Sequence, residues 1–230
     1  MSDEQSEDDF QEIGVDLDIS SHPVYNDPND KIVIISNDYI KFRASKFHLM
    51  RTSQFFDGLL STVESEEPTK EEPIHLDFPS STISLFLDLS TCSNPSIPTI
   101  NSEEAKTLLD FLEYAICDDL IDIGRSSLRN SLENQPFELL VTASRRNDLE
   151  MAKHALRKID NKVYNEYFKS AFTEVEVKQY LRRLTRPYHL ALVDAAMTTI
   201  EGSFGFQLPH LTFIDDWSTF ADSFHPDQFT

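Results

Sequence analysis

Residues 32–44 read Ile32-Val33-Ile34-Ile35-Ser36-Asn37-Asp38-Tyr39-Ile40-Lys41-Phe42-Arg43-Ala44. The four β-branched residues at 32–35 are typical of a strand that is buried on both faces. The next three residues favour a turn, and apolar side chains then return at every second position, 40, 42 and 44, as in a second strand. Two strands joined by so short a turn predict a β-hairpin.

A third strand is predicted upstream of the hairpin. Ile13, Val15, Leu17 and Ile19 alternate with polar or small residues, the pattern of a half-buried strand, and the turn-rich residues 20–30 end it. Its apolar face must be buried, either against the sheet of this chain or against a partner protein. The four residues are therefore candidates for a partner interface.

Downstream of the hairpin the pattern first mixes helices with one more strand. Residues 47–60 are typical of helix, 61–73 form a charged loop, and apolar side chains at 74, 76 and 78 predict a strand. Ser80 is the predicted cap of a short helix whose inward face holds Ile83, Phe86, Leu87 and Ser90.

From residue 101 onward the pattern is helical throughout. Asn101 and Glu104 have the spacing of a capping box, and the predicted inward stripe of that helix runs as far as Ile116. Asp118 or Asp119 is predicted to cap the next helix, Pro136 to open another and Asp148 to cap a fourth, and two further apolar stripes lie within 177–199. A strand-rich start that leads into a run of short helices predicts an α+β fold.

The chain resembles the BTB/POZ domain family, in its stand-alone fungal form. The resemblance covers residues 22–160 and rests on an ordered set of motifs. These are HPVY at 22–25, DKIVII at 30–35, FRASKFHL at 42–49, SQFFDGLL at 53–60, IHLD at 74–77, and the helical segments 108–114 and 136–155. One position departs from the family pattern, because Ser45 stands where the family carries histidine.

The resemblance implies a small β-sheet in the N-terminal half, covered by pairs of short α-helices. It divides the chain into an acidic tail with an edge strand (1–21), a BTB/POZ-like domain (22–160), additional helices (161–200) and an acidic aromatic tail (201–230). The implied function is that of a dimeric adaptor or scaffold in the cytoplasm or nucleus, one that binds other proteins such as a cullin-type ubiquitin ligase. Recruitment of transcriptional co-regulators is the alternative, and neither role requires an enzymatic activity or a cofactor.

The charge of the chain limits its partners. The formal net charge is −20, residues 1–30 and the residues after Arg186 contain no Lys or Arg, and the middle of the chain is nearly neutral. Acidic ends of this kind disfavour nucleic acid and anionic membranes. No apolar run is long enough to span a membrane, and the acidic start of the chain does not resemble a signal peptide.

One motif favours a metal-dependent enzyme instead. Asp118-Asp119-Leu120-Ile121-Asp122 has the DDxxD spacing that could hold Mg²⁺ bound to a diphosphate. The competing interpretation is a helix start, where carboxylates are stabilised by the helix dipole. The two interpretations separate on exposure, because an enzyme needs these carboxylates to face a cavity. The histidines and the two cysteines, Cys92 and Cys117, show no spacing of metal ligands.

The C-terminal residues form the last candidate site. Residues 203–230 contain six phenylalanines and Trp217 with no positive charge. Phe213, Trp217, Phe220 and Phe224 are spaced by four, three and four, which places them on one face of a short helix. Such a face fills a hydrophobic groove, either on this domain or on another protein.

Overall fold

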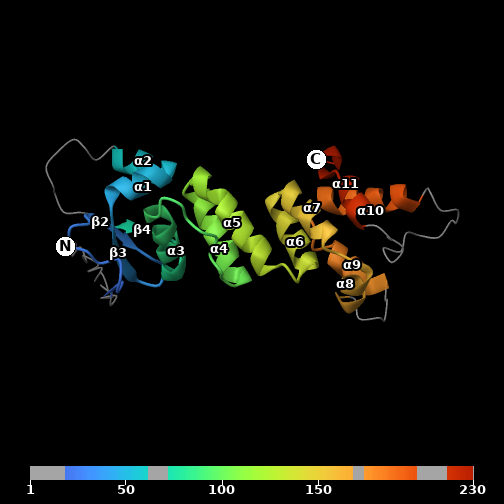
Figure 1. The fold of residues 1–230 in the computed structure, drawn as a ribbon, viewed down its shortest axis with the longest axis horizontal. Coiled ribbons are helices and arrows are strands. Elements are labelled where there is room, and N and C mark those ends of the chain that lie inside the picture. The colour runs from blue at the N-terminus through green and yellow to red at the C-terminus, as the bar shows by residue number, and fades with distance from the viewer. Residues whose placement is uncertain (1–18, 62–71, 168–173, 201–216, 230) are drawn as a thin grey trace, which may run out of the picture. The chain divides into compact units, whose positions relative to one another are not determined.

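A computed structural model describes residues 19–61, 72–167, 174–200 and 217–229 (Figure 1). It contains a small sheet and a larger number of helices, so the predicted α+β class is confirmed. Contacts divide the chain into two compact units: unit 1 is Met1–Pro95 with Asp110–Leu120, and unit 2 is Ser96–Leu109 with Ile121–Thr230. The division runs through two helices, α4 (Ser102–Tyr114) and α5 (Asp118–Ser131), and the predicted domain 22–160 therefore spans parts of both units.

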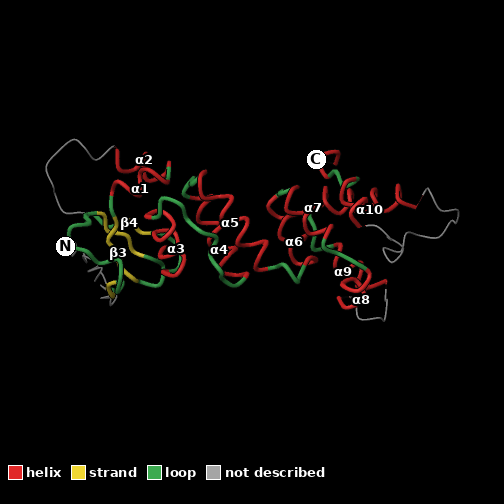
Figure 2. Tube along the Cα trace, viewed as in Figure 1, coloured by secondary structure: helices red, strands yellow, loops and turns green. Residues whose placement is uncertain are grey.

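The sheet lies in unit 1 (Figure 2). Its strands are β1 (Ser20–Ser21), β2 (Ile32–Ile35), β3 (Ile40–Ala44) and β4 (Ile74–His75), in the order β1-β3-β2-β4. The predicted hairpin is confirmed, since β2 and β3 pair antiparallel with Ile34 opposite Phe42. β1 pairs in parallel with β3, and β4 pairs in parallel with β2. The hairpin therefore forms the centre of the sheet, with β1 and β4 at its two edges.

Unit 1 also contains the helices α1 (Lys46–Thr52), α2 (Gln54–Ser61) and α3 (Ser80–Thr91). Phe86 of α3 lies between Phe56 of α2 and Phe111 of α4, with ring centroids 6.0 and 4.9 Å away. Apolar residues from both halves of the chain are predicted to form the core, and seven of the eight expected there are buried, Phe42, Leu49, Phe56, Leu76, Leu108, Leu112 and Leu140, while the eighth, Phe55, is half-buried.

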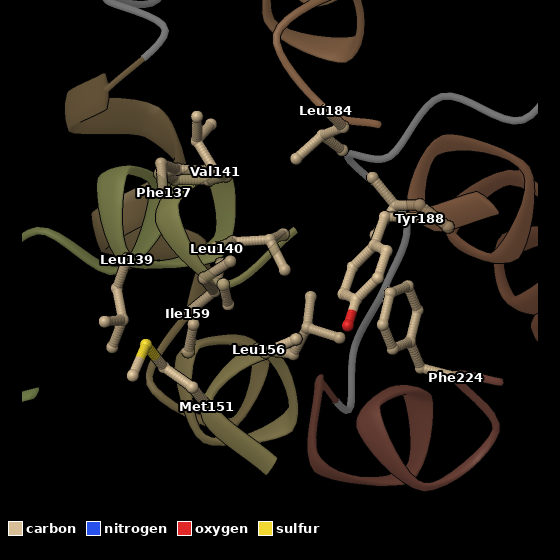
Figure 3. Close-up of a cluster of buried hydrophobic side chains, with 14 of the residues drawn as sticks. Phe137, Leu139, Leu140, Val141, Met151, Leu156, Ile159, Leu184, Tyr188 and Phe224 are labelled. Carbon is tan, nitrogen blue, oxygen red and sulfur yellow. The ribbon is translucent and has the colours of Figure 1, made fainter. Parts of the chain in front are cut away.

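Unit 2 is helical in its described part. After α5 it contains α6 (Pro136–Arg146), α7 (Leu149–Arg157), α8 (Asn161–Tyr167), α9 (Glu174–Leu181), α10 (Arg186–Ile200), α11 (Trp217–Asp222) and a final 3₁₀ turn, η3 (Pro226–Phe229). Figure 3 shows its core, in which side chains of α6 and α7 meet Tyr188 of α10 and Phe224. The rings of Tyr188 and Phe224 are 5.6 Å apart at their centroids.

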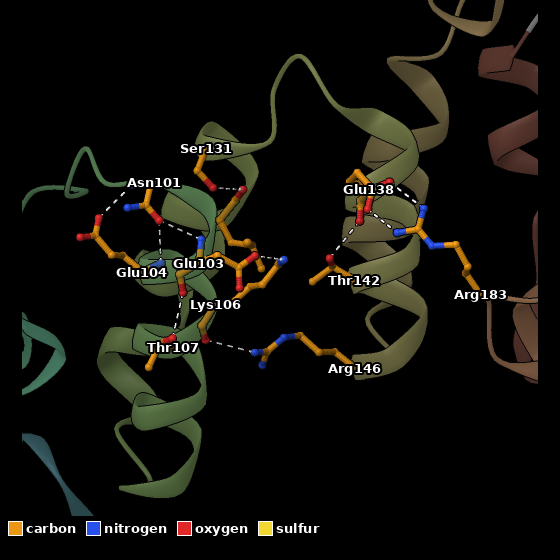
Figure 4. A network of polar contacts seen from close by, with 11 residues as sticks. Asn101, Glu103, Glu104, Lys106, Thr107, Ser131, Glu138, Thr142, Arg146 and Arg183 are labelled. Atoms are coloured by element: carbon orange, nitrogen blue, oxygen red, sulfur yellow. Dashed lines mark hydrogen bonds and ion pairs between the residues drawn. The ribbon is translucent and has the colours of Figure 1, made fainter. Parts of the chain in front are cut away.

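The helix starts of unit 2 follow the predicted caps. Asn101 accepts hydrogen bonds from the amides of Glu103 and Glu104, both at 3.0 Å, and the Glu104 carboxylate accepts one from the Asn101 amide at 3.1 Å (Figure 4). Asp148 caps α7 by accepting from the Met151 amide at 2.9 Å. Each bond satisfies an amide that has no partner within its own helix.

Three local predictions in unit 1 are wrong. The strand predicted at 74–78 is regular only at Ile74–His75, although the Leu76 amide still donates to the Ile35 carbonyl at 2.9 Å. Ser80 is the first residue of α3 rather than its cap, and the Asp38 carboxylate accepts from its amide and its hydroxyl at 2.8 and 2.6 Å. The helix α5 already begins at Asp118, so neither aspartate precedes it as a cap.

Candidate partner-binding surfaces

The N-terminal edge of the sheet is the first candidate surface. Of its four predicted residues, Ile13, Val15 and Leu17 lie outside the described residues, and Ile19 is 43% exposed. The strand pairing begins one residue later, at Ser20, within the region predicted as a turn. In the described sheet β1 pairs with β3 alone, which leaves its outer edge as an edge strand.

His22 holds the segment that follows β1. Its amide donates to the Lys41 carbonyl at 2.8 Å, and its ring stacks on buried Phe42 with centroids 4.6 Å apart. Its Nδ1 accepts from the amides of Val24 and Tyr25 at 3.3 and 3.1 Å. This turn leaves the Val24 side chain 75% exposed, the largest exposed fraction among the exposed large apolar residues of the described chain.

The first helix adds a second exposed apolar side chain to unit 1. Phe47 on α1 is 64% exposed, whereas Leu49 on the same helix is buried. The guanidinium of Arg51 lies 5.6 Å from the centre of the Phe47 ring and also donates to the Ser90 carbonyl of α3 at 2.7 Å. The ring of Phe47 therefore has a defined place on the surface.

The start of α2 is bonded to the end of α4. The Ser53 hydroxyl accepts from the Phe56 amide at 3.2 Å, as a helix cap does, and donates to the Ala115 carbonyl. The amides of Gln54 and Phe55 donate to the carbonyls of Ile116 and Ala115 at 3.2 and 3.3 Å. Amides and carbonyls that have no partner in their own helices thus satisfy one another.

Ile116 differs from its prediction. It was expected on the buried stripe of α4, but the helix ends at Tyr114, and Ile116 is 45% exposed with φ of 52°. The Cys117 amide donates to the Leu112 carbonyl and the Ile116 amide to the Glu113 carbonyl, at 2.9 and 3.2 Å, which is the Schellman pattern of a helix end. Glycine is the usual residue at this left-handed position, and a β-branched side chain there is strained.

Four apolar residues are brought together by this joint, and we call them the α2–α4 patch: Phe55, Leu59, Tyr114 and Ile116. The rings of Phe55 and Tyr114 have centroids 5.3 Å apart, and Leu59 follows Phe55 by one helical turn. Tyr114 is 51% exposed, and Leu59 is also exposed. The exposed position of Ile116 was missed because no glycine marks the end of α4; the aspartates that follow are the signal that could have shown it.

Carboxylates flank the Ile116 side of the α2–α4 patch. Glu113 precedes Tyr114, and Asp118 and Asp119 follow Ile116 closely; all three are exposed. Asp57 is two residues from both Phe55 and Leu59 and therefore lies on another face of α2. Gln54 donates to Asp118 at 2.7 Å, which fixes this carboxylate beside the helix joint. Neither α2 nor the segment 110–120 contains a Lys or Arg, so the two segments that form the patch supply no positive charge.

The C-terminal candidates lie in unit 2. Trp217, Phe220 and Phe224 are buried in its core, with Trp217 only 6% exposed, and Phe213 lies outside the described residues. Trp217 and Phe220 pack edge to face with centroids 5.3 Å apart. Asp222 of α11 forms an ion pair with Arg157 of α7 at 2.7 Å. In this structure the apolar face of α11 is covered by the chain itself.

The carboxylates of the DDxxD motif lie on the exposed side of α5. Asp118, Asp119 and Asp122 are all exposed, and Asp122 pairs with Arg125 at 3.6 Å. Among the described residues, no group of three or more His, Cys, Asp and Glu side chains is placed to hold a metal ion. The arrangement is the one expected of a solvated helix start.

A cavity of about 310 Å³ lies elsewhere in unit 1. Its lining includes Tyr25, Asp30, Ser45 and His48, together with residues of α3. Ser45 precedes α1 without a capping bond from its hydroxyl, and the Nδ1 of His48 is buried without a hydrogen-bond partner. Burial and a hydrogen bond to Asp88 raise the pKa of Tyr25. The hydroxyl of Tyr25 is therefore a hydrogen-bond donor and not an ionised group at neutral pH.

Comparison with known proteins gives this chain no relative: no family model matches it, and no curated protein matches it. No helix in the described part of the chain combines the length and the apolar character that crossing a membrane requires.

Proposed function

We propose that this chain is a protein–protein interaction module with a BTB/POZ-like fold, and that it acts as a dimeric adaptor. The single observation that carries the proposal is the exposure of apolar side chains on the N-terminal edge and on α1. These are the elements through which BTB domains commonly dimerise. Exposed apolar side chains that are held in place mark surfaces that other proteins cover.

The order of elements in unit 1 supports the same proposal. A β-hairpin, the helix pair α1 and α2, a strand parallel to β2, a further helix and then α4 follow one another as the family resemblance implies. The edge strand β1 offers backbone groups to a second chain, and Val24 and Phe47 offer apolar surface. A symmetric pair of such surfaces is the commonest way in which soluble proteins dimerise.

The test is the mass of the purified chain in solution. Light scattering coupled to size-exclusion chromatography is expected to give twice the chain mass for the natural protein and the monomer mass for Val24→Asp combined with Phe47→Asp. Leu190→Asp is the matched control, because Leu190 is an exposed apolar residue of unit 2. Circular dichroism checks that each variant keeps its helices.

A monomeric natural protein would refute the dimer, and a dimer that survives the double variant would refute this interface. The partner class that the resemblance implies is a cullin-type ligase subunit. A purified cullin N-terminal domain is therefore the first partner to test, by titration against the natural chain. Absence of binding at concentrations of tens of micromolar would refute the cullin as a partner, but it would not refute the proposed interaction module.

A further inference from the structure

We infer that the α2–α4 patch docks a segment of another protein in which an apolar side chain is flanked by Lys or Arg. The inference rests on the proposed role as an interaction module, and it adds a second site together with the chemistry of its partner. The patch consists of Phe55, Leu59, Tyr114 and Ile116, which no other candidate surface shares.

The first argument is the place of the Ile116 side chain. The chain carries isoleucine at a left-handed position, φ of 52°, where glycine is favoured, and nearly half of that side chain is exposed. The exposed part of the Ile116 side chain contributes nothing to the packing of unit 1. Strained residues of this kind concentrate at binding sites, where the surrounding structure holds them in place.

The second argument is rigidity. Three hydrogen bonds join α2 to the end of α4: two from the amides of Gln54 and Phe55, and one from the Ser53 hydroxyl. These bonds fix the apolar side chains relative to one another before a partner arrives. A preformed surface loses little conformational entropy on binding.

The third argument is charge, and it selects the occupant. Asp118 and Asp119 follow Ile116 closely and are exposed, and neither α2 nor the segment 110–120 supplies a positive charge. A second copy of the chain would bring the same carboxylates to the interface, where like charges repel. A partner with Lys or Arg around an apolar side chain complements both the centre and the border of the patch.

The three longest segments outside the described residues are also poor occupants. Residues 1–18 carry eight Asp or Glu and no Lys or Arg, 62–71 carry four acidic residues and one lysine, and 201–216 carry three acidic residues and no Lys or Arg. Each of these segments would place further negative charge beside the carboxylates. The observations therefore favour a basic segment from a different protein.

The experiment selects peptides from a random displayed library on the full-length chain and measures their binding by fluorescence anisotropy. The selected peptides are expected to carry Lys or Arg next to Leu, Ile or an aromatic residue. Ile116→Gly should lower their affinity about tenfold or more, since it removes an exposed apolar side chain of the patch. Asp118→Asn combined with Asp119→Asn should also weaken binding and reduce its dependence on salt.

Tyr39→Gly is the matched control for Ile116→Gly. Tyr39 lies in the β2–β3 turn of unit 1, is also exposed and also has a positive φ, 61°. Both substitutions therefore remove an exposed apolar side chain and relieve the same backbone strain. The selected peptides should bind Tyr39→Gly as tightly as they bind the natural chain.

The outcomes separate this inference from the dimer. Ile116→Gly should keep the solution mass of the natural chain whether that chain is a dimer or a monomer. A change of mass in this variant would mean that a second copy covers the patch, which would overturn the inference. Equal binding by Ile116→Gly, acidic or uncharged selected peptides, or an unenriched library would overturn it as well.

Discussion

Unit 1 and unit 2 differ in how many of their large apolar side chains are exposed to solvent. Seven of the ten exposed large apolar side chains of the described residues belong to unit 1: Ile19, Val24, Tyr39, Phe47, Leu59, Tyr114 and Ile116. Unit 2 exposes only the other three of these ten, Ile97, Tyr167 and Leu190, and the aromatic face of α11, which by sequence could serve a partner, is packed into its core. Exposed apolar surface points to binding, so the difference directs the search for partners to unit 1.

The largest expected effect tests the enclosed core of unit 2. Phe220 is fully buried, and Phe220→Ala should lower the free energy of unfolding by about 3–5 kcal/mol through lost burial and a cavity. Trp217, the only tryptophan, packs against it, so tryptophan fluorescence in a urea titration reports this region directly. Phe47→Ala is the exposed control and should shift the midpoint little. Equal midpoints for the two variants would contradict the burial of α11.

The next effect concerns a helix start in unit 1. Asp38 accepts hydrogen bonds from the amide and hydroxyl of Ser80, so Asp38→Ala should cost about 1–2 kcal/mol, as the loss of a helix cap does. Asp38→Asn keeps an acceptor and should recover most of the loss. The free energy of unfolding from urea titrations checks both variants. An Asn variant as unstable as the Ala variant would show that the charge, and not the cap, is what matters.

A smaller effect with the opposite sign is expected at Ile116. Glycine relieves a left-handed strain of about 1–2 kcal/mol but loses about 0.5–1 kcal/mol of backbone entropy, so Ile116→Gly should stabilise by up to about 1.5 kcal/mol. The melting temperature should then rise by about 2–4 °C for each kcal/mol. Tyr39→Gly, at the other strained and exposed position of unit 1, should behave alike. A lowered melting temperature for Ile116→Gly would mean that its side chain supports the fold.

The smallest effect is a pH dependence in unit 2. The Glu138 carboxylate accepts from Arg183, and this hydrogen bond holds its pKa below the usual value (Figure 4). Because the folded pKa is the lower one, the contribution is complete above the unfolded pKa of about 4.3 and is lost as pH falls through the folded pKa. Both side chains are about a third exposed, so the contribution is under about 1 kcal/mol. The natural chain should have a higher urea midpoint than Glu138→Gln at pH 7, and this difference should shrink at pH 3.5. A difference that stays the same at both pH values would contradict the prediction.

Elements whose signals lie within a short stretch of sequence were predicted correctly. The hairpin followed from the alternation at 40–44 and the turn before it, and the starts of α4, α6 and α7 followed from Asn101, Pro136 and Asp148. A cap acts on amides two or three residues away, and a strand pattern repeats every second residue. Such signals are complete within a short window.

Tertiary structure alone decided which apolar faces are covered. The spacing of Trp217, Phe220 and Phe224 predicted one face of a single helix, but α11 ends at Asp222, before Phe224, and only the folded chain shows all three side chains enclosed within unit 2. Asp38 caps a helix that starts 42 residues later, which no local pattern contains. Ile116 continued the apolar stripe of α4 in sequence, yet the backbone turns left-handed there and carries it to the surface. The spacing of side chains fixes which of them share a face, whereas long-range packing fixes what that face meets.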